Sequence, residues 1–123
     1  MNSDYPSRAS PLANNYSDLV SIVMPAWKAE RYIGESIESV IAQTYTNWEL
    51  IVVDDCSPDN TSAIVQKYCK RDSRIQLIRS KSNGGPADAR NQALKQAQGR
   101  WIAFLDSDDL WDEQKLCKQI LFH

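Results

Sequence analysis

The sequence WIAFLDSDD occupies residues 101–109 and joins an apolar run to three carboxylates. An apolar run of this length, bounded by turn residues, is typical of a buried β-strand covered on both faces. The acidic residues that follow, Asp106, Asp108 and Asp109, would repel one another unless a cation or hydrogen-bond donors compensated their charge. A hard divalent ion such as Mg²⁺ or Mn²⁺ prefers oxygen ligands and often links a carboxylate to phosphate. The stretch therefore predicts a buried strand that ends in a functional site.

The alternative for these carboxylates is a purely structural role. Asp108 or Asp109 would then only cap the helix that follows, because helix N-termini favour acidic residues. The spacing D-x-D is too short to decide between the two interpretations on its own. For Asp109 we expect the capping role.

The composition is that of one soluble globular domain. The chain has 123 residues, of which 42% are hydrophobic and 24% charged, and no apolar stretch reaches the length of a membrane span. The net charge of -2 argues against a nucleic-acid partner, whose binding depends largely on clustered Lys and Arg. The first residues lack the basic and apolar segments of a secretory signal. The polar residues 1–18 are predicted to form a flexible leader.

The three cysteines are widely spaced and form no C-x-x-C pair. This pattern argues against a disulfide framework and against a zinc site, and it favours reduced thiols. We therefore expect a cytoplasmic protein, located at the inner face of the membrane.

Strand and helix patterns alternate four times along the chain. Besides the acidic stretch, strands are predicted at residues 19–24, 49–53 and 75–79, and helices at 32–41, between the turns at 57–61 and 71–73, from 86 to about 98, and at 112–122. Such alternation predicts a three-layer α/β/α fold with a mostly parallel, four-stranded sheet. Ligands of such sheets bind beyond the carboxyl ends of the strands, where the strand order reverses. Asp54 and Asp55 follow the second strand and reach the same edge as Asp106 and Asp108, which favours a site there.

Five sequence motifs, in their order along the chain, resemble those of the family 2 glycosyltransferases of GT-A fold. The resemblance runs from Val20 to about Leu116 and covers the N-terminal, Rossmann-like nucleotide-binding half of that family, which assigns residues 19–123 to this part. It implies transfer of a sugar from a nucleotide diphosphate donor, usually with inversion, using Mn²⁺ or Mg²⁺. The motifs are VSIVMP at 20–25, Ser39-Val40 with Gln43-Thr44, residues 49–61, residues 83–91 (NGGPADARN), and residues 104–109.

The resemblance places the base of the donor near the first two strand ends. Pro25, Ala26 and Trp27 would hold the base, with the Trp27 ring stacked on it, unless Trp27 belongs to the core. Either Asp54 or Asp55 would accept a hydrogen bond from the base, which favours uracil, and the other would cap the next helix.

The remaining donor contacts are implied at the third helix and the last strand. Gly85 opens that helix, and Arg90, one turn further, would reach the phosphate or ribose. The alternative for Arg90 is a surface ion pair with Asp88. Asp106 would face the ribose or the metal ion, and Asp108 would bind the metal ion that bridges the two phosphates.

The sequence departs from the family in length. Members of the family are about twice as long, as befits a two-part α/β domain, and their second half supplies the acceptor site and the catalytic base. No catalytic residue is therefore assigned here, and the acceptor, a glycan or a lipid-linked sugar of polysaccharide biosynthesis, is not specified. Because the sequence ends inside a predicted helix, we expect a truncated product that binds a donor weakly and transfers nothing unaided.

Three other functions fit parts of the sequence. In a haloacid-dehalogenase-type phosphatase Asp106 would attack phosphate, but that motif opens its domain and needs further motifs downstream. A receiver-like signalling domain would need a lysine and a hydroxyl residue at later strand ends. A non-catalytic interaction module, such as a homodimer, would pair through an exposed sheet edge.

Overall fold

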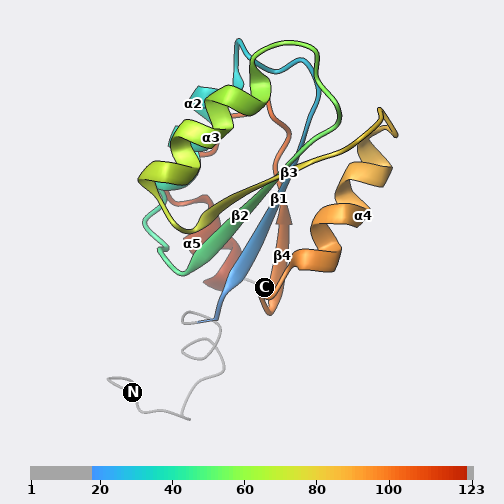
Figure 1. Ribbon diagram of the computed structural model, residues 1–123. Helices are drawn as coiled ribbons and strands as arrows, with labels where there is room; N and C mark the ends of the chain where they lie inside the picture. Colours follow the sequence, from blue (N-terminus) through green and yellow to red (C-terminus); the bar gives the residue numbers. More distant parts are fainter. Residues whose placement is uncertain (1–17, 122–123) are drawn as a thin grey trace.

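A computed structural model describes residues 18–121 (Figure 1). The expected leader therefore lies outside the described residues, apart from Asp18. The described chain alternates strictly between strands and helices after its first strand. Its elements are β1 (Val20–Ala26), α2 (Ile33–Ile41), β2 (Trp48–Asp54), α3 (Thr61–Arg71), β3 (Ile75–Arg79), α4 (Pro86–Gln96), β4 (Trp101–Phe104) and α5 (Lys115–Leu121).

The four strands form one sheet in the order β3-β2-β1-β4, and every neighbouring pair is parallel. The prediction of a parallel α/β sheet is thus confirmed. The chain adds β2 and β3 on one side of β1 and then crosses over to place β4 on the other side. The strand order consequently reverses between β1 and β4, which is where a ligand site is expected in such a fold.

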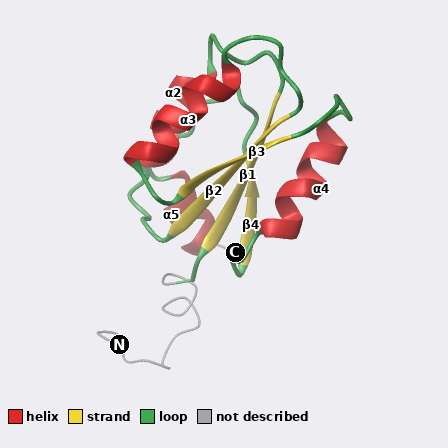
Figure 2. Cartoon of the chain, viewed as in Figure 1, coloured by secondary structure: helices red, strands yellow, loops and turns green. Residues whose placement is uncertain are grey.

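Helices cover both faces of the sheet, as Figures 1 and 2 show. On one face α2, α3 and α5 pack over alternate strand residues such as Ile22, Leu50 and Val52. On the other face α4 packs against Val23 and Ile51. Successive residues of a strand point to opposite faces of the sheet. Because helices cover both faces, β1 is apolar on both sides.

Helix α4 approaches the sheet closely because its contact residues are small. Pro86 occupies the first helical turn, and Ala89 and Ala93 are fully buried against the sheet. Beside α4, the same face of β4 carries Ile102 and Phe104, which are 40% and 53% exposed. None of the helices in the described residues combines the length and the apolar character that a bilayer crossing requires.

Three expectations about the last part of the chain are wrong. The strand β4 is not covered on both faces, because it lies at the edge of the sheet and exposes Ile102 and Phe104. The final helix begins at Lys115 rather than at Asp112. Asp109 does not cap it, since it lies six positions earlier and its N–H donates to the carbonyl oxygen of Asp106 at 3.0 Å. The carboxylate of Asp112 instead accepts a hydrogen bond from the N–H of Gln114, at 3.0 Å. Ser36 and Ser39 of α2 form hydrogen bonds with the loop between β4 and α5. Local sequence does not predict these contacts.

Candidate functional site

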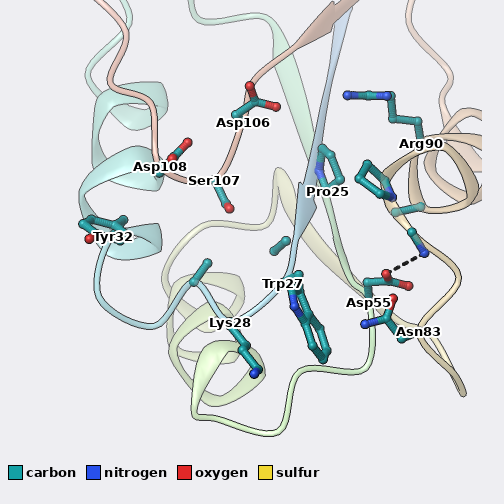
Figure 3. A pocket seen from close by; sticks show the side chains of 15 residues that line it. Pro25, Trp27, Lys28, Tyr32, Asp55, Asn83, Arg90, Asp106, Ser107 and Asp108 are labelled. Atoms are coloured by element: carbon teal, nitrogen blue, oxygen red, sulfur yellow. Dashed lines mark hydrogen bonds between the residues drawn. The ribbon is translucent and has the colours of Figure 1, made fainter.

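A pocket of about 550 Å³ lies at the carboxyl ends of β1, β2 and β4 and beside the N-terminus of α4 (Figure 3). It thus occupies the point where the strand order reverses. Residues from four separate segments of the chain meet in it. Of the residues predicted to bind the donor or a metal, all except Asp54 line it: Pro25, Ala26, Trp27, Asp55, Gly85, Arg90, Asp106 and Asp108.

The structure separates the two adjacent carboxylates at the end of β2. Asp54 is buried and accepts hydrogen bonds from the Ser57 N–H at 3.0 Å and from the Ser62 hydroxyl. It therefore holds the turn and the first residues of α3. Asp55 lines the pocket, and the sequence could not tell which of the two would do so.

Asp55 fixes the glycine turn before α4. Its two carboxylate oxygens accept hydrogen bonds from the N–H groups of Gly84 and Gly85, at 3.0 and 2.8 Å. Gly85 has φ +92° and ψ 169°, a backbone conformation that is essentially restricted to glycine. This turn sets the N-terminus of α4 beside the pocket, where its dipole favours an anion.

The loop after β1 carries Trp27 into the pocket wall. Trp27 is 43% exposed, so it is not a core residue, and the Nζ of Lys28 lies 5.3 Å from the centre of its ring. Lys28 has a left-handed φ of 49°, and its N–H donates to the Ser57 hydroxyl oxygen at 3.0 Å. The next N–H, of Ala29, donates to the Thr61 hydroxyl oxygen at 3.0 Å. The residues that follow β2 thus anchor the loop that carries Trp27.

Asp59 completes this anchor. Its carboxylate accepts hydrogen bonds from both the N–H and the hydroxyl of Thr61, at 3.1 and 2.5 Å. Burial alone would raise the pKa of Asp59, but the hydrogen bonds from Thr61, from the backbone of Glu30 and from its own backbone together lower the pKa below its ordinary value.

The acidic residues after β4 form the opposite wall. Asp106 and Asp108 are both exposed, and Figure 3 shows Arg90 and Asp106 pointing toward each other across Pro25. Arg90 forms no ion pair with Asp88 within residues 18–121, and side chains two positions apart on a helix do not face each other. The Asp88 carboxylate accepts a hydrogen bond from Gln92 Nε2 at 3.1 Å. Arg90, Asp106 and Asp108 all line the pocket, and Asp108 lies on the side of Tyr32 in Figure 3.

Asp106 and Asp108 offer carboxylate oxygens, which are the donor atoms that Mg²⁺ and Mn²⁺ prefer. Such ions are commonly held by one or two carboxylates together with the phosphates of a substrate. No group of three Asp, Glu, His or Cys side chains that could hold a metal ion exists in the described part of the chain. Asp106 and Asp108 would consequently need phosphate or water oxygens to complete the coordination of an ion.

Seven further residues line the pocket that were not predicted to bind the donor or a metal ion: Lys28, Ala29, Tyr32, Asn83, Pro86, Ala89 and Ser107. Lys28, Asn83 and Ser107 are sequence neighbours of predicted residues and could have been found from that adjacency. The sequence predicts a helix that begins at Tyr32, yet Tyr32 precedes α2 and is 49% exposed.

Comparison with known proteins places this fold among nucleotide-sugar enzymes. Residues 21–123 match the family described as "Glycosyl transferase family 2". A curated relative from Escherichia coli is "UDP-Glc:alpha-D-GlcNAc-diphosphoundecaprenol beta-1,3-glucosyltransferase WfgD", 56% identical over 102 residues. The match covers 83% of this chain and 40% of WfgD, so the chain spans two fifths of that relative.

Solved structures of the GT-A glycosyltransferase class share the fold. Staphylococcus aureus TarS, residues 1–349 in complex with UDP, superposes with a TM-score of 0.78 at 39% identity, covering 84% of this chain and 31% of the TarS chain. TarS has also been solved in complex with UDP-GlcNAc. The mannosyltransferase PcManGT from Pyrobaculum calidifontis, in complex with GDP-Man and Mn²⁺, has a TM-score of 0.73 at 28% identity, covering 76% of this chain and 28% of PcManGT.

Proposed function

The chain belongs to glycosyl transferase family 2, and from this membership we propose that it binds the nucleotide diphosphate of a sugar donor for a metal-dependent, inverting glycosyltransferase. The observation that carries the proposal is the pocket in which Trp27, Asp55, the N-terminus of α4 and Asp108 meet. An aromatic ring, a carboxylate, a helix N-terminus and an acidic loop are together suited to a base, its N–H group and a diphosphate.

The base is proposed to lie between Trp27 and Asp55, and UDP is the proposed nucleotide. Uracil carries a ring N–H that a carboxylate oxygen accepts well. Each oxygen of Asp55 accepts one hydrogen bond from a glycine N–H, and a carboxylate oxygen has room for a second donor. The UDP complex of TarS and the UDP-Glc in the name of WfgD support this choice.

The diphosphate is proposed to lie between α4 and the loop after β4 that carries Asp106 and Asp108. Asp106 and Asp108 would hold a divalent metal ion, which supplies a positive charge that stabilises the departing nucleoside diphosphate. Arg90 would contact a phosphate or the ribose as a cationic hydrogen-bond donor. The Mn²⁺ in the PcManGT complex supports a metal ion in this fold.

The acceptor hydroxyl and the base that deprotonates it are not assigned to residues of this chain. The name of WfgD describes a diphosphoundecaprenol-linked sugar as acceptor, which supports a lipid-linked acceptor and an inner membrane face as the place of action. The phosphatase alternative is not favoured, because the relatives and the structural neighbours are glycosyltransferases.

Isothermal titration calorimetry of the chain with UDP, with and without MnCl₂, tests this proposal. We expect binding that depends on Mn²⁺ and an affinity at least about tenfold lower for Asp108→Asn, since this change removes one charged ligand of the ion. Glu113→Gln is the matched control, because Glu113 is an exposed carboxylate five residues away that does not line the pocket. It should bind UDP like the unchanged chain.

Two results would contradict the proposal. Equal affinity with and without Mn²⁺, unchanged in Asp108→Asn, would exclude the metal-dependent part. Absence of heat with UDP, GDP and TDP under both conditions would exclude donor binding, and concentration-dependent dimerisation without nucleotide would then favour the non-catalytic module.

A further inference from the structure

Helix α2 presents a polar stripe that does not line the pocket. The stripe consists of Ser36 and Ser39, which lie three residues apart on one face of α2, and of Gln43, which follows the last helical residue, Ile41, by two positions. Ser36 is completely buried and Gln43 is 4% exposed. Burying such groups is unfavourable unless they form hydrogen bonds, so their partners indicate their role.

The partners of Ser36 are the backbone on both sides of Asp108. Its hydroxyl oxygen lies 2.8 Å from the carbonyl oxygen of Ser107 and 2.6 Å from that of Asp109. A hydroxyl has one proton, so the two carbonyls share a single donor. Ser36 thus contacts both neighbours of the residue proposed to bind the metal ion.

The other two residues of the stripe continue along the same loop. The N–H of Trp111 donates to the Ser39 hydroxyl oxygen at 3.1 Å. Gln43 donates from Nε2 to the carbonyl oxygen of Asp112 at 2.6 Å and accepts from the N–H of Leu116 at 3.0 Å. Residues 105–114, here called the acidic loop, form neither helix nor strand. The stripe therefore supplies hydrogen bonds that regular secondary structure would otherwise supply.

We propose that Ser36, Ser39 and Gln43 are positioning residues that hold the acidic loop in the conformation that binds the metal ion and the diphosphate. This inference rests on the proposed function for the role of Asp106 and Asp108. A loop of this length would otherwise lose conformational entropy on binding. Hydrogen bonds from side chains on α2 and just after its end remove that cost in advance. It also gives a role to the Ser39 and Gln43 motif, which donor contacts do not explain.

Hydrogen exchange of the ligand-free chain tests the positioning directly. In Ser36→Ala we expect the amides of Asp109 and Trp111 to exchange about tenfold faster, while those of β2 and α4 keep their rates. Tyr68→Phe is the matched control. It also removes one hydroxyl that contacts α2, and the two hydrogen bonds of this hydroxyl go to the Gly34 carbonyl and the Glu38 carboxylate rather than to the acidic loop. A uniform increase over the whole chain, or no increase in the acidic loop, would overturn the proposal.

Calorimetry tests the consequence for the site. Ser36→Ala should lower the affinity for UDP in the presence of Mn²⁺ about tenfold, but leave that for uridine, which has no phosphate, unchanged. In an Asp108→Asn background the same change should cost much less, because both changes act through one residue. Additive effects, or equal losses for UDP and uridine, would show a merely structural role. If the unchanged chain binds no UDP, the proposed function fails, whereas the exchange rates still decide the positioning.

Discussion

Asp54 and Asp55 show how the direction of a single side chain decides a role. They are adjacent at the end of β2, and successive side chains of a strand point to opposite sides. Asp54 turns toward Ser62 at the start of α3, whereas Asp55 turns toward Gly84 and Gly85 before α4. Only the second direction leads into the pocket.

The two hydrogen bonds of Asp55 predict the effect of Asp55→Asn. The amide of asparagine has one acceptor oxygen, so one glycine N–H would lose its partner and face an NH₂ group instead. We expect a loss of about 1–3 kcal/mol in the free energy of unfolding, measured by urea denaturation. Asp109→Asn, at an exposed carboxylate, should change it by less than about 0.5 kcal/mol. Equal stability of the two variants would argue against the two hydrogen bonds.

At the scale of elements, the junction of α4 and β4 is built on a chain of hydrogen bonds. The Gly99 N–H donates to the Ser21 hydroxyl oxygen at 2.8 Å, and that hydroxyl donates to Glu49 at 2.5 Å. The same carboxylate accepts from the N–H of Gln98 at 2.7 Å. These hydrogen bonds attach the segment between α4 and β4 to β1 and β2. They therefore position β4, which the acidic loop follows.

The close approach at Gly99 predicts a sharp difference between two Gly→Ala substitutions. A Cβ at Gly99 would lie 2.6 Å from the backbone nitrogen of Ser21 and 2.8 Å from the carbonyl oxygen of Leu19. Since backbone must move, Gly99→Ala should lower the free energy of unfolding by about 1–3 kcal/mol. Gly34→Ala lies in α2 with its nearest neighbour at 3.5 Å, and it should be neutral or stabilising. Thermal denaturation of both variants checks this, and similar melting temperatures would contradict it.

At the scale of the whole molecule, one sheet with helices on both faces brings four distant segments to one edge. The crossover from β3 through α4 to β4 places the acidic loop beside the end of β1. No segment forms the pocket alone, so its geometry depends on the stability of the entire sheet.

The stability of the whole molecule should depend on pH through Asp72. The side chain of Arg74 donates hydrogen bonds to Asp72 and lowers its pKa below the ordinary 3.8. Because the pKa of Asp72 is lower in the folded than in the unfolded chain, ionised Asp72 stabilises the fold above the unfolded pKa. This stabilisation is lost as pH falls through the folded pKa. Urea denaturation should thus show stability declining from about pH 5 to about pH 2. In Asp72→Asn this decline should be shallower, and an unchanged slope would contradict the prediction.

The sequence by itself determined the order of strands and helices, the parallel sheet and the acidic strand ends, because apolar periodicity and turn residues act locally. Tertiary structure alone decided that Asp55 rather than Asp54 faces the pocket and that α5 begins at Lys115. It also decided that Ser36 meets Ser107, 71 residues away in the chain. Hydrogen bonds depend on the direction and separation of side chains, and packing across the sheet sets both between residues that no local pattern connects.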